Sequence, residues 1–354
     1  MCKIVVLAET AHPACIGGIE TFERVLKNFF REKITFIAYP TAKKKIFTVE
    51  NIEEVFSLNI FFRILNKLFN NKIKYYFVKK KIRKLNPDIC ILRMPYNIDF
   101  IDNNKIKTIL VQHSAFEVYK DYHFKQGNNL LEKLKEKLDC FIFLSKYDQE
   151  KFVKELNFPI EKTRVIRHTS SIELLKEKKN KNKRLIMIGR ISNKEKRFDL
   201  VVKAMKKLSD FSLNIYGDGE DKEFLADIIK KNNLKNVFLY DAVSNVQEEL
   251  DKASILICSS ELEAYGIVNI EAMRRGLPII LRNSFTSAQD IIQGNGILLE
   301  KEWNEQEFLN AVHIIYKNYE EYSEKSCKLG IRYNHEIIKK EWKDLISELK
   351  GESL

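Results

Sequence analysis

The sequence predicts an α/β protein of two domains, each built on a parallel β-sheet with helices packed against it. Short apolar runs alternate with amphipathic segments along the first half of the chain, which is typical of strands joined by crossover helices. The same alternation restarts near residue 185, after a charged stretch. A chain of 354 residues is also long enough for two domains that each bury a core.

The first domain is expected at residues 1–171. Six apolar runs there have the length and composition of buried strands: residues 3–8, 34–38, 89–92, 108–111, 140–144 and 164–166. A helical pattern at residues 20–30 follows the paired glycines Gly17 and Gly18. Helical patterns also separate most of the other runs.

Residues 172–183 are charged, lack strand character and are expected to form a linker. The second domain is predicted at residues 184–330, with helices at 197–208 and 220–233. Its expected strands are residues 185–188, 213–216, 237–240, 255–258, 278–281 and 296–299. Residues 331–354 continue a helical pattern to the end of the chain.

Composition narrows the class of protein. Hydrophobic residues make up 45% of the chain and charged residues 31%, as in soluble globular proteins. No apolar run approaches the roughly 18–20 residues of a membrane span, and no secretory pattern opens the chain. The six cysteines are scattered without a C-x-x-C pair, which favours reduced thiols. A cytoplasmic location is therefore expected.

The net charge of +12 lies in the first half of the chain. Residues 1–170 contain 31 Lys and Arg against 19 Asp and Glu. Residues 60–86 hold nine of these basic residues, no acid and several aromatic residues, a composition that suits an anionic membrane surface. A solvated basic helix is the alternative. Nucleic acid would also fit the charge, but nothing else in the sequence supports it.

Two glutamates, Glu263 and Glu271, indicate a ligand site in the second domain. The predicted strand 255–258 precedes them, and a helical pattern begins at Gly266. The carboxyl edge of a parallel sheet is where ligands bind, and the free N–H groups near Gly266 and Ile267 suit a phosphate. Carboxylates beside it can accept hydrogen bonds from sugar hydroxyls. We therefore expect a phosphorylated sugar or a nucleotide sugar.

The string from Glu263 to Glu271, with Glu271-Ala272-Met273 and Gly276-Leu277-Pro278 after it, resembles the E-x7-E signature of family-4 glycosyltransferases. The resemblance implies the GT-B fold, in which two Rossmann-like domains face a cleft and the C-terminal helix crosses back to the first domain. It implies that Glu263 contacts the transferred sugar and Glu271 the ribose. The backbone around Tyr265, Gly266, Ile267 and Val268 would bind the donor.

Cations are needed to stabilise a departing diphosphate. No D-x-D motif and no closely spaced histidine ligands occur, so no metal or other cofactor is expected. The run Gly189-Arg190 to Lys196 resembles the family's G-R-x5-K phosphate-binding motif, which makes Arg190 and Lys196 the expected cations. Lys194 is a competing candidate, because the family's spacing varies.

Three further features resemble parts of the family's site. Gly17 and Gly18 resemble its N-terminal glycine loop, and Gly217 and Gly219 resemble its G-x-G turn; either pair could also serve only as a turn. His113 follows a predicted strand, where the family has a histidine that faces the transferred sugar. The sequence departs from the family at three places. Phe285-Thr286 replaces a Gly-Gly pair, Asp290 stands for an acid in the next helix, and Tyr240-Asp241 replaces a glycine after the predicted strand that begins at residue 237.

Together these features predict a retaining hexosyltransferase that uses a nucleotide sugar, with a UDP-linked sugar as the expected donor. The acceptor would be a glycan or a polyprenyl-linked glycan, in bacterial surface polysaccharide synthesis. The basic residues 60–86 would hold the enzyme at the inner face of the cell membrane. A nucleotide-sugar epimerase of the same fold and a non-catalytic GT-B partner protein are the alternatives.

Overall fold

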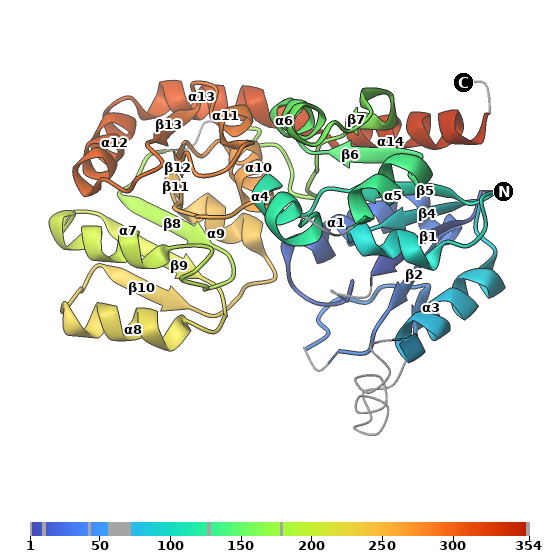
Figure 1. The fold of residues 1–354 in the computed structure, drawn as a ribbon. Coiled ribbons are helices and arrows are strands. Elements are labelled where there is room, and N and C mark those ends of the chain that lie inside the picture. Colours follow the sequence, from blue (N-terminus) through green and yellow to red (C-terminus); the bar gives the residue numbers. More distant parts are fainter. Residues whose placement is uncertain are drawn as a thin grey trace. The chain divides into compact units, whose positions relative to one another are not determined.

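The computed structural model describes residues 2–8, 12–41, 44–55, 72–125, 129–177 and 180–351. The chain forms two compact units, each with its own sheet (Figure 1). The first unit comprises Met1–Leu144, Asp148–Ile166 and Lys339–Leu354, and the second comprises Ser145–Tyr147 and Arg167–Ile338. Both are Rossmann-like α/β domains, as the sequence predicts.

The sheet of the first unit has seven parallel strands in the order β3-β2-β1-β4-β5-β6-β7. Their bounds are β1 Ile4–Ala8, β2 Ile34–Ala38, β3 Ile52–Glu54, β4 Ile89–Leu92, β5 Lys107–Val111, β6 Cys140–Phe143 and β7 Thr163–Val165. Six of these strands were predicted. Strand β3 was missed because it is a short, half-buried edge strand with the sequence Ile-Glu-Glu, which gives no apolar run.

Helices cover both faces of the first sheet, as a parallel sheet requires. Side chains of α3, α5 and α6 join one core cluster, with Val78, Leu134 and Phe152 packed beneath β1, β4, β5 and β6. The helical elements are α1 Gly18–Phe30, η1 Arg31–Lys33, α3 Lys72–Leu85, η2 Pro95–Phe100, α4 Phe116–Val118, η3 Tyr119–His123, α5 Leu130–Lys137, α6 Lys146–Leu156 and η4 Ile160–Lys162.

The last helix, α14 (His335–Lys350), begins in the second unit, and its residues from Lys339 onward belong to the first. Trp342 on this helix is buried, and its ring lies 6.0 Å from that of Phe22 on α1. Near the end of the helix, Glu348 pairs with Arg164 of β7. The closing helix therefore returns to the first domain, as the sequence predicts.

The sheet of the second unit has six parallel strands in the order β10-β9-β8-β11-β12-β13. Their bounds are β8 Arg184–Ile188, β9 Ser212–Tyr216, β10 Val237–Tyr240, β11 Ile255–Cys258, β12 Ile279–Arg282 and β13 Gly296–Leu299. All six were predicted from their apolar runs, although β10 and β13 at the two edges of the sheet are only partly buried. The order reverses between β8 and β11, the position at which open α/β sheets bind ligands.

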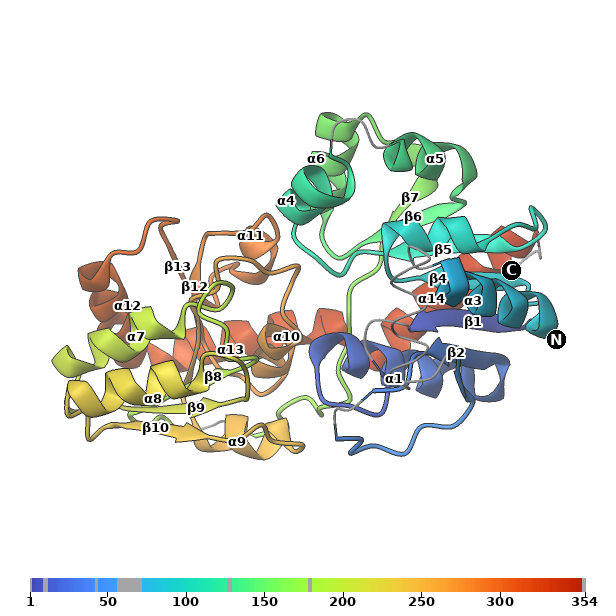
Figure 2. The same cartoon turned by 60° about the horizontal axis from the view of Figure 1, so that its bottom comes forward.

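The helices of the second unit pack on this sheet in the same layered way (Figure 2). Phe198, Leu225 and Phe308, from three different helices, share one core cluster with alternate residues of β8, β9 and β11. The elements are α7 Phe198–Ala204, η5 Met205–Lys207, α8 Lys222–Lys231, α9 Val246–Lys252, α10 Ile267–Arg274, α11 Ala288–Ile291, α12 Glu305–Lys317, α13 Tyr319–Gly330 and η6 Ile331–Tyr333.

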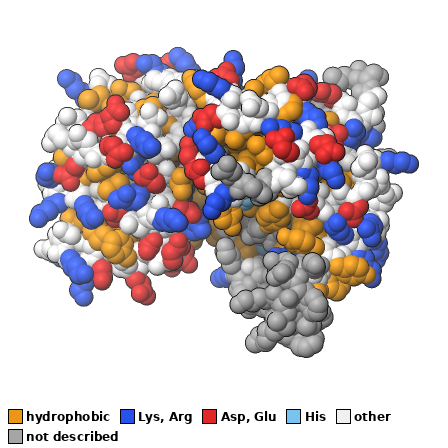
Figure 3. Space-filling model, viewed as in Figure 1, with side chains coloured by type: hydrophobic (Ala, Val, Ile, Leu, Met, Phe, Trp, Pro, Cys, Tyr) orange, Lys and Arg blue, Asp and Glu red, His pale blue; other side chains and the backbone are white. Residues whose placement is uncertain are grey.

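Charge is mixed over the surface of the second unit. In Figure 3, basic and acidic side chains are interspersed over the face that this view shows of α7, α8 and α12. This agrees with the equal numbers of basic and acidic residues in the second half of the sequence. Within the described ranges, no helix has both the length and the apolar character needed to cross a bilayer.

Candidate functional site

The loop after β11, residues 259–266, is the centre of the candidate site in the second unit. It is fastened to the loop after β8 by both side chain and backbone. The hydroxyl of Ser259 donates to the carbonyl oxygens of Lys196 and Arg197, at 2.9 and 3.0 Å. The N–H of Glu261 donates to the carbonyl oxygen of Glu195, at 2.7 Å. These contacts fix two strand-end loops side by side at the carboxyl edge of the sheet.

This arrangement brings the side chains of Lys196 and Glu263 into a direct ion pair. Their side chains are only 20% and 17% exposed, so water screens the pair weakly. Burial alone would lower the pKa of Lys196, but the charge of Glu263 and other nearby acids outweighs it, and the net effect raises that pKa. The ammonium is therefore charged at neutral pH, as a phosphate-binding group must be.

Arg190 and Lys194, the other two predicted cations, lie differently. Arg190 follows β8 and Gly189, its side chain is 59% exposed, and it pairs with Glu195 of its own loop. Lys194 is exposed on the same loop. Of the three basic residues, Lys196 alone pairs with Glu263 within the described part of the chain. Lys196 is therefore the better candidate for the second member of the phosphate-binding motif.

Helix α10 begins directly after the loop. Gly266 precedes it with φ of 78°, a left-handed conformation that favours glycine. A Cβ atom there would lie 2.6 Å from the amide nitrogen of Asn269, which itself donates to the carbonyl oxygen of Tyr265 at 2.9 Å. The N–H groups of Ile267 and Val268 open the helix, where no intrahelical acceptor exists for them. Glu263 thus lies beside a helix N-terminus able to receive an anion.

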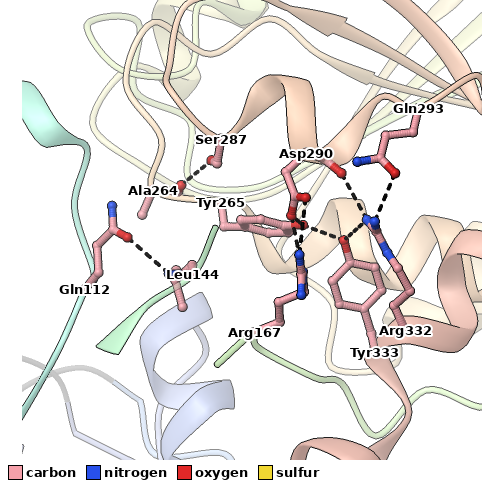
Figure 4. Close-up of polar contacts among 10 residues, drawn as sticks. All are labelled: Gln112, Leu144, Arg167, Ala264, Tyr265, Ser287, Asp290, Gln293, Arg332 and Tyr333. Atoms are coloured by element: carbon pink, nitrogen blue, oxygen red, sulfur yellow. Dashed lines mark hydrogen bonds and ion pairs between the residues drawn. The ribbon is translucent and has the colours of Figure 1, made fainter. Parts of the chain in front are cut away.

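Tyr265 is placed in a way that the sequence did not indicate. Its side chain is 1% exposed, and its hydroxyl donates to Asp290 at 2.7 Å and also contacts the hydroxyl of Tyr333 (Figure 4). Burial raises its pKa well above the usual value. The side chain of Tyr265 is therefore engaged within the protein and is not presented to a ligand.

Glu271 lies one turn into α10 and is 8% exposed. Its carboxylate accepts a hydrogen bond from the hydroxyl of Ser170, at 3.0 Å. That hydroxyl accepts in turn from the N–H of Ile172 at 3.2 Å, so its own proton is directed to Glu271. Ser170 thus orients the carboxylate. No local pattern in the sequence indicates this contact, because the two residues are 101 positions apart.

Gly217 and Gly219 follow β9, and close backbone packing explains why both positions are glycine without any contact with a ligand. A Cβ atom on Gly217 would lie 2.0 Å from the carbonyl oxygen of Gly189, and one on Gly219 would lie 2.3 Å from that of Ile191. The N–H of Ile191 donates to the carbonyl oxygen of Asp218 at 2.9 Å. Both glycines let the loop after β9 lie directly against the loop that carries Arg190 and Lys196.

Gly17, Gly18 and His113 belong to the first unit. The carboxylate of Glu20 fills the space above Gly17, where a Cβ atom would lie 2.0 Å from one of its oxygens. Arg24 holds the glycine loop by donating to the carbonyl oxygens of Pro13 and Cys15, at 2.9 and 2.7 Å. These contacts set the start of helix α1. The contribution of Gly17 and Gly18 to donor binding stays a prediction.

His113 follows β5, as predicted. Its backbone N–H donates to the hydroxyl of Tyr119 at 3.2 Å, and its ring packs edge-on against Phe22 with centroids 5.2 Å apart. Among the described residues, no group of three or more His, Cys, Asp or Glu side chains is arranged to hold a metal ion. Independence from metal nevertheless remains a prediction, as does a direct role for His113.

The ion pair leads to a first prediction. The substitution Glu263→Gln should lower the pKa of Lys196, because it removes the attraction and leaves the burial. The measurement is the pH dependence of competitive acylation of Lys196, followed by mass spectrometry. Glu195→Gln is the control, since Glu195 affects that pKa less than Glu263 does. Equal shifts in both variants would show that Glu263 does not set the charge state of Lys196.

Comparison with known proteins shows similarity to glycosyltransferases. Residues 172–331 match the family model described as glycosyl transferases group 1. The chain is 27% identical over 306 residues to an uncharacterized glycosyltransferase of Haemophilus influenzae, covering 80% of this chain and 84% of the relative. It is also 27% identical to the poly(glycerol-phosphate) alpha-glucosyltransferase of Bacillus subtilis, over 47% of this chain but only 25% of that protein.

Solved structures show the same fold. The crystal structure of Anabaena HepE in complex with UDP and glucose superposes with a TM-score of 0.78 at 15% identity, covering 98% of this chain and all of that one. The predicted α/β architecture is therefore confirmed as that of GT-B glycosyltransferases. The second unit, which holds Lys196 and Glu263, is the part that matches the group 1 family model.

Proposed function

We propose that this protein is a retaining glycosyltransferase that moves a hexose-type sugar from a UDP-linked donor to a glycan or lipid-linked acceptor. The observation that carries the proposal is the Lys196–Glu263 ion pair beside the N-terminus of α10. A fixed cation, a carboxylate and free backbone N–H groups then lie together at the carboxyl edge of a parallel sheet. That set matches a sugar joined to a diphosphate.

Each residue has a proposed role in the donor complex. Lys196, assisted by Arg190, would stabilise the negative charge that grows on the diphosphate as the glycosidic bond breaks. Glu263 would accept hydrogen bonds from sugar hydroxyls, and the N–H groups of Ile267 and Val268 would face a phosphate. Glu271, oriented by Ser170, would accept from the ribose diol. No metal is needed in this scheme, because the protein supplies the positive charge.

Donor binding would also separate Lys196 from Glu263. Without a ligand, the charge of Lys196 is compensated by Glu263. A bound diphosphate would take over that compensation, and the carboxylate would then be available to the sugar. The pair keeps the half-buried ammonium charged, because the attraction of the carboxylate offsets the cost of desolvating the lysine.

The setting of the reaction is inferred from relatives. The Bacillus subtilis relative is named as acting on poly(glycerol-phosphate), and Anabaena HepE binds UDP and glucose. We infer that the acceptor belongs to a bacterial surface polysaccharide. Thermal shift with a panel of nucleotide sugars identifies the donor, since binding raises apparent stability. Nucleotide release that depends on added acceptor distinguishes a transferase from an epimerase of the same fold.

The proposed ribose contact is tested by Glu271→Gln. Glutamine keeps an oxygen for Ser170 but loses the charge that strengthens hydrogen bonds to the ribose. Such a bond contributes about 1.5–3 kcal/mol, so UDP affinity should fall roughly tenfold to a hundredfold. Calorimetry with UDP measures this. Glu320→Gln is the control, because Glu320 is an exposed glutamate on α13 outside the candidate site, and UDP affinity should then change little. Unchanged affinity in Glu271→Gln would remove the ribose role.

Turnover tests the fixed-cation mechanism. Lys196→Ala should lower kcat about a hundredfold with a smaller effect on KM, because the diphosphate charge develops mainly in the transition state. Lys194→Ala, an exposed lysine on the same loop, should stay near wild type. The reverse ranking would assign the phosphate to Lys194. Activity should persist in excess EDTA, and loss of turnover that Mg²⁺ or Mn²⁺ restores would contradict the mechanism.

We also propose that the basic segment at residues 60–86 binds an anionic membrane surface. Arg63 and Lys67 lie outside the described residues. On α3, Lys79 and Arg83 both pair with Asp102, and Lys81 pairs with Glu53, each at 2.8 Å. Acids distant in sequence therefore neutralise part of the charge. Lys80 and Lys84 are exposed and make no ion pair within the described ranges, and Tyr76 is 58% exposed on the same helix.

Vesicle co-sedimentation tests this membrane contact with a matched pair. Neutralising Lys80 and Lys84 should weaken binding to anionic vesicles roughly thirtyfold, since each of the two contacting charges contributes about 1 kcal/mol. Lys81→Gln, which removes a lysine already paired with Glu53, should have a smaller effect. Binding should also fall at high salt. Equal binding to neutral and anionic vesicles would leave the segment as a solvated surface.

A further inference from the structure

A buried hydroxyl–carboxylate cluster lies directly behind the candidate donor loop. It consists of Tyr265, Asp290, Tyr333 and Arg167, all in the second unit (Figure 4). The two tyrosines and Asp290 are 1%, 0% and 4% exposed. Arg167 donates to both carboxylate oxygens of Asp290, with Nε–Oδ2 at 3.2 Å and Nη2–Oδ1 at 3.3 Å. None of these contacts is needed to form the sheet.

The protons of this cluster can be assigned from the donors. The hydroxyl of Tyr265 gives its only proton to Asp290, at 2.7 Å. The contact between the two tyrosine hydroxyls must then be donated by Tyr333, whose oxygen accepts from Arg332 Nη2 at 3.1 Å. The hydrogen bonds therefore run from Arg332 through Tyr333 and Tyr265 to Asp290. Bonds that point the same way polarise one another and strengthen the chain.

The cluster is joined to the donor loop at consecutive residues. Tyr265 itself lies between Glu263 and Gly266. The carbonyl oxygen of Ala264 accepts from the hydroxyl of Ser287, just before the short helix α11 that carries Asp290. The N–H of Asp290 donates to the carbonyl oxygen of Ser287 at 3.0 Å. A single short element thus holds the peptide of Ala264 and the ring of Tyr265.

The cluster is braced from two other segments. Thr169 and Arg274 donate to the carbonyl oxygen of Tyr333, the latter at 3.2 Å. Arg332 donates to the carbonyl oxygen of Asp290 at 3.0 Å. Replacing such buried polar groups by apolar ones often costs little stability, so fold stability alone does not require them. What the hydrogen bonds add is a fixed direction and distance.

We propose that Asp290, Tyr265 and Tyr333 are positioning residues that set the geometry of Glu263 and of the first N–H groups of α10. This inference rests on the proposed donor site. It assigns these side chains no contact with the donor. A shift of the loop by about 1 Å can lower a rate about a hundredfold, because reacting groups must be aligned within fractions of an ångström. The cluster should therefore act on turnover more than on nucleotide affinity.

The test compares Tyr265→Phe with Tyr333→Phe. Each variant deletes one buried hydroxyl, but only Tyr265→Phe removes the donor to Asp290 that holds the loop. We expect Tyr265→Phe to lower kcat by about tenfold or more, and Tyr333→Phe to lower it less. The affinity for UDP should change less than kcat in both, since Glu271 is untouched. Equal kcat in both variants and wild type, with only Tm reduced, would overturn the proposal and leave a structural role.

A second readout does not depend on the proposed reaction. If the loop loosens, Glu263 moves from Lys196, and the pKa of Lys196 should fall in Tyr265→Phe and less in Tyr333→Phe. Asp290→Asn, which keeps the side-chain shape, replaces Tyr265→Phe if that variant does not fold. A wild-type protein that binds no nucleotide would count against the proposed function. An unchanged pKa of Lys196 in the loop variants would count against the positioning role.

Discussion

The candidate site depends on the ion pair between Lys196 and Glu263. The two residues are 67 positions apart and follow different strands, β8 and β11, which are neighbours in the sheet. The pair forms because Ser259 and Glu261 tie the two loops together by backbone acceptors. Desolvation by itself lowers the pKa of this half-buried lysine, and the charge of the adjacent carboxylate opposes that effect. A phosphate-binding cation can therefore be kept charged where water is scarce.

Backbone contact between strand ends imposes a second constraint. The loops after β8 and β9 approach so closely that Gly217 and Gly219 cannot carry a side chain. Gly266 is required by its positive φ. These glycines resemble parts of a nucleotide-binding pattern, yet their first cause is the mutual packing of the loops. A sequence motif can thus mark a site through the scaffold that shapes it, without each of its residues touching the ligand.

The sequence predicts most of the fold and the polar residues of the site, for identifiable reasons. Buried parallel strands are continuous apolar runs, so twelve were expected where the structure has them, whereas the edge strand β3 has no such run. Lys196 and Glu263 were each expected in the site because each belongs to a motif of its own, but their ion pair was not predicted. The contacts of Ser170 and Tyr265 were not expected. Ser170 lies 101 positions from Glu271, and Tyr265 lies 68 positions from Tyr333, so neither hydrogen bond leaves a local pattern in the sequence.

The surface charge of α3 is also difficult to predict from a local stretch of sequence. Residues 72–86 contain basic residues and no acid, and the sequence therefore predicts a strongly positive face. In the folded unit, Asp102 forms ion pairs with Lys79 and Arg83, and Glu53 forms one with Lys81. A charge count along the chain overestimates the field of a surface whenever acids from other segments pack beside it, since opposite charges a few ångströms apart cancel at longer range. The effective positive charge of α3 is thus set by tertiary contacts and is concentrated on the exposed lysines that have no acidic neighbour among the described residues.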